Sequence, residues 1–175
     1  AVLHATGRRA NTEGLGLENT DIELRPNGTI VVDEFCQTAV ENVFAVGDVN
    51  GGLQFTYVSL DDFRVVNGYL HGNKEYTTAD RKNVPYSTFI SPALSHVGLH
   101  KEEAEAAYSN VAVASLPVAN MPRGAVNQDP RGLFRVTVDK DTNLILGATL
   151  FGKNSEEIIN LIKMAIDNKI PYTYI

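Results

Sequence analysis

The sequence runs Asn42-Val43-Phe44-Ala45-Val46-Gly47-Asp48 at the point that decides its fold. The apolar residues before Gly47 predict a short strand buried on both faces of a sheet, as in parallel α/β folds. Gly47 allows the backbone to bend or to approach a ligand closely, and Asp48 then lies where open α/β sheets bind nucleotides. A carboxylate there accepts hydrogen bonds from sugar or polyol hydroxyls. A Gly-Asp pair alone also fits a simple strand cap or turn, so the neighbouring motifs matter.

Two further motifs flank this run, one upstream and one downstream. Upstream stands Ala1-Val2-Leu3-His4-Ala5-Thr6-Gly7-Arg8-Arg9-Ala10-Asn11, and downstream stands Val84-Pro85-Tyr86-Ser87-Thr88-Phe89-Ile90-Ser91-Pro92, then Val97-Gly98-Leu99. Together with Thr38, these motifs resemble the FAD-dependent pyridine nucleotide-disulfide oxidoreductases. The resemblance covers essentially the whole chain, but only the rear part of a family member. Ala10 departs from the pattern, because the family usually has proline there.

The resemblance implies FAD and NAD(P)H as the cofactors of the intact parent enzyme, and it indicates cofactor-binding residues in this chain. Asp48 would hold the ribityl chain of FAD beside Gly47, while Gly7 and Arg8 would lie near the seam between the cofactor domains. A helix amino terminus offers unpaired N–H groups and partial positive charge to an electron-rich ring. The residues expected to face the flavin ring with their backbone are Phe55, Thr56, Tyr57 and Val58.

The helix start also indicates a branch of the family. It reads Phe55-Thr56-Tyr57-Val58-Ser59-Leu60-Asp61-Asp62-Phe63-Arg64, without the Leu-Ala-His typical of dihydrolipoamide dehydrogenase and glutathione reductase. The segment is more similar to bacterial reductases of reactive chlorine and hypothiocyanous acid. Because adjacent helical residues point about 100° apart, Asp61 and Asp62 are interpreted as first-turn charges rather than paired acid/base carboxylates.

The sequence predicts four parts. Residues 1–11 are expected to form the exit strand of a missing NAD-binding domain, residues 12–75 the C-terminal half of an FAD-binding domain, residues 76–83 a linker, and residues 84–175 a dimerisation domain truncated at its C-terminus. The fold class is α/β and α+β: a partial FAD-binding domain followed by an α+β dimerisation domain with an antiparallel sheet and helices. The chain begins at Ala1 without methionine, and the family's catalytic segment should follow Ile175. An inactive fragment without catalytic residues is therefore expected.

Local patterns place the elements of both halves. In the first half they predict a hairpin across Pro26-Asn27-Gly28 and a helix over 58–70 that Gly72 ends. In the second half they predict strands over 86–90 and 111–116, a helix over 101–108, a hairpin of strands 133–138 and 144–150, and a last helix from Ser155. That helix carries a wide apolar arc, which favours a homodimer: Ile158, Ile159, Leu161, Ile162, Ala165 and Ile166.

Composition narrows the range of partners and settings. The formal net charge of −6 argues against nucleic acid, and no apolar run approaches the ~20 residues of a membrane span. The single cysteine, Cys36, indicates a reducing, cytoplasmic location and is interpreted as a buried residue rather than a reactive thiol. The histidines are expected to be surface or satisfied residues rather than metal ligands: His4, His71, His96 and His100.

Two other functions stay open beside the disulfide reductase. In one, residues 84–175 form a non-enzymatic self-association module and residues 1–75 an appendage that stabilises it. In the other, the chain comes from a flavin NADH oxidase, which shares Gly47-Asp48 but uses another electron acceptor.

Overall fold

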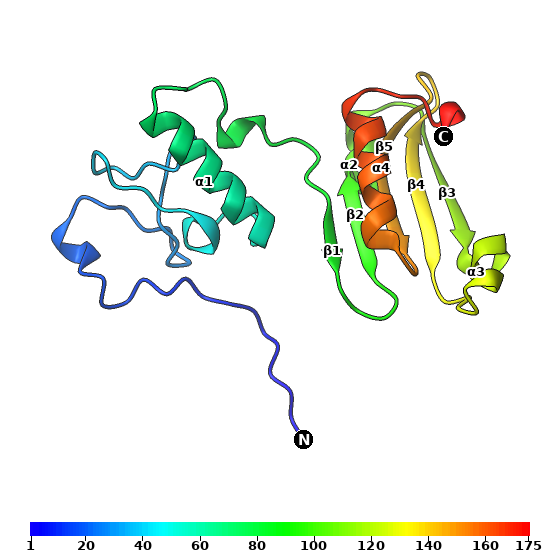
Figure 1. Ribbon diagram of the computed structural model, residues 1–175, viewed down its shortest axis with the longest axis horizontal. Helices are drawn as coiled ribbons and strands as arrows, with labels where there is room; N and C mark the ends of the chain where they lie inside the picture. Colours follow the sequence, from blue (N-terminus) through cyan, green and yellow to red (C-terminus); the bar gives the residue numbers. More distant parts are fainter. The chain divides into compact units, whose positions relative to one another are not determined.

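The computed structural model describes residues 1–175, which form two compact units, Ala1–Arg81 and Lys82–Ile175 (Figure 1). Most of the first unit is loop and turn, whereas the second is built on a five-stranded sheet. None of the helices combines the length and apolar content needed to cross a bilayer.

One long helix organises the first unit. Helix α1, Thr56–Leu70, buries Val58, Asp62 and Val65 on one side. It begins before Val58, where the sequence predicted its start, and it ends as expected just before Gly72, whose φ of +80° suits glycine at a helix end. The other elements of this unit are single 3₁₀ turns at Leu17–Asn19, Gly47–Asn50 and Thr78–Asp80.

Two strands predicted in the first unit are absent. Residues 1–11 contain no strand and are almost entirely exposed, and residues 42–46 form only one isolated bridge, between Gln37 and Phe44. Val46 is extended, with φ −123° and ψ 153°, but a strand also needs a hydrogen-bonded neighbour along its length, which this unit does not provide. The predicted hairpin turn is confirmed in a short form, with a bridge between Leu24 and Ile30.

The second unit is an antiparallel α+β domain. The strands lie in the order β1-β2-β5-β4-β3, and helix α4 packs across β2 and β5 (Figure 1). The predicted strands, hairpin and helices are confirmed with small shifts at their ends, whereas β2 and α3 were missed. The bounds are β1 Tyr86–Thr88, β2 Leu94–Gly98, α2 Lys101–Ala107, β3 Val111–Pro117, α3 Pro122–Val126, β4 Leu133–Asp139, β5 Leu144–Phe151 and α4 Ser155–Asp167, with single turns at Val118–Asn120 and Tyr172–Tyr174.

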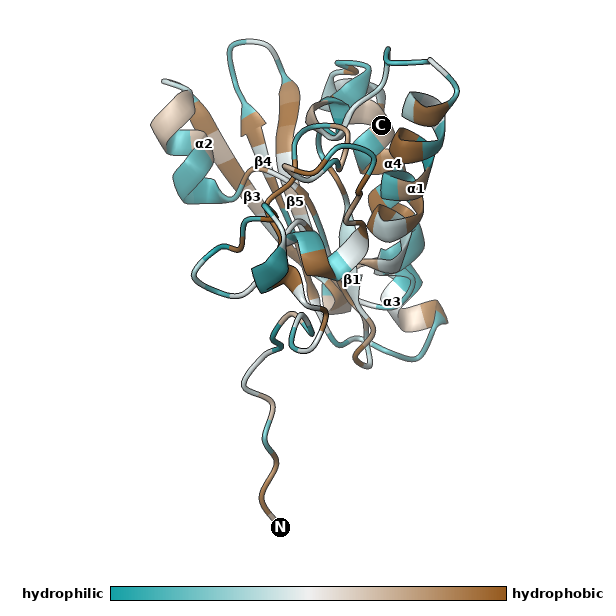
Figure 2. Cartoon of the chain, turned by 90° about the vertical axis from the view of Figure 1, so that its left-hand side faces the viewer, coloured by the Kyte–Doolittle hydropathy of each residue, from teal (hydrophilic) through white to brown (hydrophobic).

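The core of this unit lies between the sheet and α4. Val97, Ala148, Leu150 and Ile159 are buried together, and apolar colour runs along both the sheet strands and α4 in Figure 2. Burying each large aliphatic side chain of this kind stabilises the fold by roughly 1.5–3 kcal/mol. Most of the predicted apolar arc of α4 is used here, since Ile158, Ile162 and Ile166 also pack against this core.

Two glycines let β2 and β5 approach each other where the chain turns toward α2. Gly98 and Gly147 are partners in the sheet register. A Cβ on Gly98 would lie 2.3 Å from the Leu146 carbonyl oxygen, and a Cβ on Gly147 would lie 2.1 Å from the Leu99 carbonyl oxygen. Gly98 also has a φ of +78°, so only glycine fits at this pair of positions.

Candidate functional site

Asp48 is accessible at the surface of the first unit. It stands in the 3₁₀ turn Gly47–Asn50, which directly follows the extended residue Val46. Its side chain is 43% exposed, and Oδ2 accepts a hydrogen bond from Nη1 of Arg8 at 3.2 Å. Because the Arg8 side chain is 75% exposed, this pair contributes at most about 1 kcal/mol. The carboxylate is therefore available to a ligand that offers hydroxyl groups.

Gly47 allows the turn to lie directly on helix α1. Its φ is +73°, and a Cβ at this position would lie 2.6 Å from Oγ of Ser59. Any larger residue would separate the turn from the helix or strain the backbone. The predicted close approach at Gly47 is thus a contact with the chain's own helix.

The amino terminus of α1 presents two aromatic rings. The Phe55 and Tyr57 rings are stacked, with centroids 5.4 Å apart and an interplanar angle of 4°. No side chain caps this helix end. Thr56 is exposed, whereas the Val58 side chain is buried and its N–H donates to the Phe55 carbonyl at 3.0 Å. Burial raises the pKa of Tyr57, so the phenol stays protonated at neutral pH.

The structure brings most of the predicted site residues together. Arg8 meets Asp48, and Gly47 packs on Ser59 of the helix that begins directly after Phe55. Gly7 is the exception, because it is exposed and a Cβ there would meet nothing within 4 Å.

A buried ionic cluster beside the turn was missed. Asp62 is 1% exposed and accepts hydrogen bonds from the Gly47 N–H at 2.7 Å and from Nδ2 of Asn50 at 3.0 Å. Nη2 of Arg81 lies 2.5 Å from Oδ1 of Asp62, and Nε of Arg81 lies 2.6 Å from Oδ2 of Asp61. We call Gly47, Asn50, Asp61, Asp62 and Arg81 the Asp62 cluster.

The interpretation of Asp61 and Asp62 as first-turn charges was wrong. The helix begins at Thr56, so both residues lie beyond its first turn, and both pair with Arg81. A signal was present in the sequence, because Asp62 follows Val58 by four residues and precedes Val65 by three. That spacing places the carboxylate on the apolar face of the helix.

Cys36 lies beside this cluster and is fully buried, as predicted. Burial, followed by the neighbouring charge of Asp62, raises the pKa of the Cys36 thiol to about 12, although Arg81 opposes the shift. The thiol is therefore protonated at neutral pH and unsuited to nucleophilic chemistry.

His96 in the second unit has partners for both ring nitrogens. Nδ1 lies 2.8 Å from Oγ1 of Thr149, Nε2 lies 3.0 Å from the Gly98 carbonyl oxygen, and the ring stacks on His100 at 3.9 Å. The prediction of a satisfied histidine is confirmed here. Burial lowers the pKa of His96.

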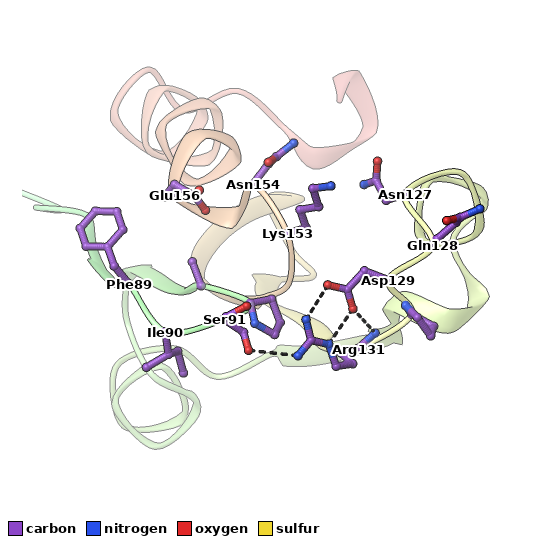
Figure 3. A pocket seen from close by; sticks show the side chains of 13 residues that line it. Phe89, Ile90, Ser91, Asn127, Gln128, Asp129, Arg131, Lys153, Asn154 and Glu156 are labelled. Carbon is purple, nitrogen blue, oxygen red and sulfur yellow. Dashed lines mark hydrogen bonds and ion pairs between the residues drawn. The ribbon is translucent and has the colours of Figure 1, made fainter.

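The second unit also has an open hollow of about 720 Å³ between the loop that precedes β2, the loop that precedes β4 and the start of α4. Figure 3 shows the Arg131 guanidinium between the Asp129 carboxylate, at 2.8 Å, and the Ser91 carbonyl oxygen, at 3.3 Å. Arg131 lowers the pKa of Asp129 to about 2. These charges are paired with each other rather than directed at a ligand.

Comparisons with known proteins agree with this arrangement. A family model described as pyridine nucleotide-disulphide oxidoreductase matches residues 1–62, and the dimerisation domain of the same name matches residues 84–175. The chain is 46% identical to a probable pyridine nucleotide-disulfide oxidoreductase, RclA of Escherichia coli, over 99% of this chain and 39% of that protein. It is 36% identical to a glutathione reductase of Burkholderia cepacia, over 95% of this chain and 37% of that protein.

A solved structure shows the same fold. The HOCl-induced flavoprotein disulfide reductase RclA of E. coli superposes with a TM-score of 0.91 at 46% identity, over 97% of this chain and 39% of that one. The chain thus spans less than two fifths of the length of these relatives.

Proposed function

The chain belongs to the pyridine nucleotide-disulphide oxidoreductase family, and from this premise we propose that it forms the rear part of an FAD- and NAD(P)H-dependent flavoprotein disulfide reductase. The observation that carries the proposal is the exposed Asp48 carboxylate on a turn that packs directly on the start of α1. When bound, FAD supplies the redox chemistry that links a nicotinamide to a disulfide.

The residues of this turn and helix end fit a flavin nucleotide. Asp48 offers an accessible acceptor for ribityl hydroxyls, and Arg8 holds that carboxylate at one oxygen only. The uncapped amino terminus of α1 offers N–H donors and partial positive charge for the electron-rich edge of a ring. Phe55 and Tyr57 place flat apolar surface beside it. We propose that Gly47, Thr56, Val58 and Gly7 also take part in cofactor binding.

Within the family we place the chain nearest the reductases of reactive chlorine species and hypothiocyanous acid. The Thr-Tyr-Val-Ser-Leu-Asp-Asp-Phe-Arg segment from Thr56 to Arg64 supports this choice. So does the 46% identity to a relative named as an HOCl-induced flavoprotein disulfide reductase, against 36% to a glutathione reductase. Reduction would proceed through a cysteine pair that this chain lacks, since Cys36 is its only cysteine.

We propose further that the second unit pairs with a second copy. The match of residues 84–175 to the dimerisation domain supports this, as do Leu161 and Met164 on α4, which are 62% and 60% exposed. Ile162 packs against the core, so a charge there would unfold the unit rather than probe an interface. Sedimentation of Leu161→Asp is the better test, and a dimer of unchanged stability would move the contact away from this face. A cytoplasmic location also stays a prediction, which cell fractionation tests.

The cofactor proposal is tested in the full-length protein that carries this sequence. We expect a flavin absorption spectrum, which NAD(P)H bleaches and a disulfide-type oxidant restores. Asp48→Ala should weaken FAD binding by roughly 1.5–3 kcal/mol, the worth of a hydrogen bond to a charged group. Asp21→Ala, which removes an exposed carboxylate in the loop before the predicted hairpin, is the matched control. Unchanged FAD binding in Asp48→Ala would remove Asp48 from the site.

The same measurement on the 175-residue chain alone addresses its predicted inactivity. We expect neither NAD(P)H oxidation nor tight FAD binding, because one carboxylate and one helix end cannot offset the cost of immobilising so large a ligand. A yellow purified chain would contradict this expectation.

A further inference from the structure

The two carboxylate oxygens of Asp62 contact different groups. Oδ2 accepts hydrogen bonds from the Gly47 N–H at 2.7 Å and from Nδ2 of Asn50 at 3.0 Å. Oδ1 faces Nη2 of Arg81 at 2.5 Å. Since the Asp62 side chain is 1% exposed, water does not compete for either oxygen. Hydrogen bonds to a charged acceptor are roughly twice as strong as those between neutral groups.

These contacts hold the two ends of the turn that carries Asp48. Gly47 and Asn50 are its first and last residues, and Asp48 lies between them. The other backbone contacts of the turn lie farther from Gly47: the Val49 carbonyl accepts from the Ile30 N–H at 2.9 Å, the Asn50 carbonyl from Nη1 of Arg25 at 2.7 Å, and the Asp48 carbonyl from the Gly51 N–H at 3.3 Å. Gly47 brings no side chain to restrain its own φ and ψ angles. Asp62 is therefore the contact that holds the Gly47 end of the turn, and with it the direction of the adjacent Asp48 side chain.

Arg81 fixes the orientation of the Asp62 carboxylate. By occupying Oδ1 it leaves Oδ2 facing the turn, and its own position is set by Nε, 2.6 Å from Oδ2 of Asp61. Burial alone would lower the pKa of Arg81, but hydrogen bonds to Asp62 and Asp61 raise it, so the guanidinium stays charged. The buried carboxylate thus has a permanent counter-charge.

We propose that Asp62 is a positioning residue for FAD, which touches no ligand but holds the Gly47–Asn50 turn so that Asp48 is aimed at the ribityl hydroxyls. The inference rests on the proposed function, because it requires Asp48 to bind FAD. It adds a residue of the helix interior that acts on the cofactor only through the turn.

The central test is a double-mutant cycle in the full-length protein, with the dissociation constant for FAD measured by flavin fluorescence on the apoprotein. Asp62→Asn should raise this constant at least tenfold. Made in an Asp48→Ala background, the same change should raise it less than threefold, because the turn then has no carboxylate left to aim. A purely structural role would predict equal effects in both backgrounds.

Two matched variants separate aiming from general destabilisation. Val65→Ala removes apolar contacts at a site equally buried on the same helix, at 1% exposed, without touching the turn. Arg64→Met removes an exposed guanidinium of the same helix, 3.7 Å from Asp61, but no contact with Asp62 or Gly47. Both should change the FAD dissociation constant less than threefold.

Asn50→Ala serves as a second variant if Asp62→Asn fails to fold, since it keeps the buried charges paired and removes the hydrogen bonds of the Asn50 side chain to Asp62, Ala45 and Gly52. It should raise the FAD dissociation constant about threefold to tenfold. FAD binding within twofold of the wild type in whichever of these two variants folds, or effects that add fully to that of Asp48→Ala, would overturn the inference. Wild-type protein that takes up no FAD would instead overturn the proposed function and the inference together.

Discussion

Arg81→Met is expected to cost much of the stability of the first unit. Methionine keeps the apolar stem of arginine and removes only the guanidinium, which is the counter-charge of the buried Asp62. The Arg81 side chain is 13% exposed and that of Asp62 is 1% exposed, so the charge left behind has almost no access to water. Breaking such a buried pair on one side costs roughly 3–5 kcal/mol.

Arg64 provides a control within the same cluster of charges. It also pairs with Asp61, at 3.7 Å, but its side chain is 64% exposed. An exposed pair of this kind is worth about 0–1 kcal/mol, so Arg64→Met should have little effect. The comparison keeps the residue type and one partner constant and varies burial.

The assay follows unfolding in urea through backbone amide signals of α1, so that the second unit does not contribute. At about 1.4 kcal/mol per tenfold change in an equilibrium constant, Arg81→Met should raise the unfolded population of this unit more than a hundredfold. Adding Asp62→Asn to Arg81→Met should restore part of the loss, because the unpaired charge is then gone. Equal effects of Arg81→Met and Arg64→Met would refute the reasoning.

Three further predictions concern titratable groups. Because burial raises the pKa of Cys36 to about 12, its thiol should not react with Ellman's reagent at pH 8 until the chain is unfolded, and rapid labelling of folded protein would contradict this. Carboxyl NMR should give Asp129 a pKa of about 2, rising toward ~4 in Arg131→Ala; an unmoved midpoint would show that Arg131 is not the cause. Burial lowers the pKa of His96, so the stability that the neutral imidazole provides should be complete above about pH 6.5 and be lost as the pH falls. His96→Gln should therefore lose less stability than the wild type between pH 7 and 5. The same dependence of stability on pH in both proteins would exclude His96 as the cause.

The elements predicted best are those whose signals are local. The hairpin of β4 and β5 follows from alternating residues around a polar turn, in which Asn143 adopts a φ of 61°. Strand β2 was missed, because Leu-Ser-His-Val-Gly looks too polar for a central strand. Ser95 and His96 are tolerated there since each finds a distant partner, Ser155 and Thr149 respectively. These partners lie far away in the sequence, so a local sequence pattern does not reveal them.

The candidate site also has one part that the sequence predicted and one part that it did not. Gly47 and Asp48 were predicted from one contiguous motif, and the structure places Arg8 on that carboxylate. Asp62 was misinterpreted, because its role depends on Arg81, which comes later in the chain and beyond the end of the helix. A carboxylate on the apolar face of a helix is a signal in itself, but its partner is decided by tertiary structure.

The paired glycines Gly98 and Gly147 are positions at which second-site mutations cannot compensate for a substitution. At most crowded positions a second mutation can compensate for the first by shrinking the neighbour. Here the atoms that a new Cβ would meet are the carbonyl oxygens of Leu146 and Leu99, which every residue carries. No choice of neighbouring side chain can therefore rescue alanine at either position. In a library of variants both sites should accept glycine alone, whatever else in the second unit has diverged.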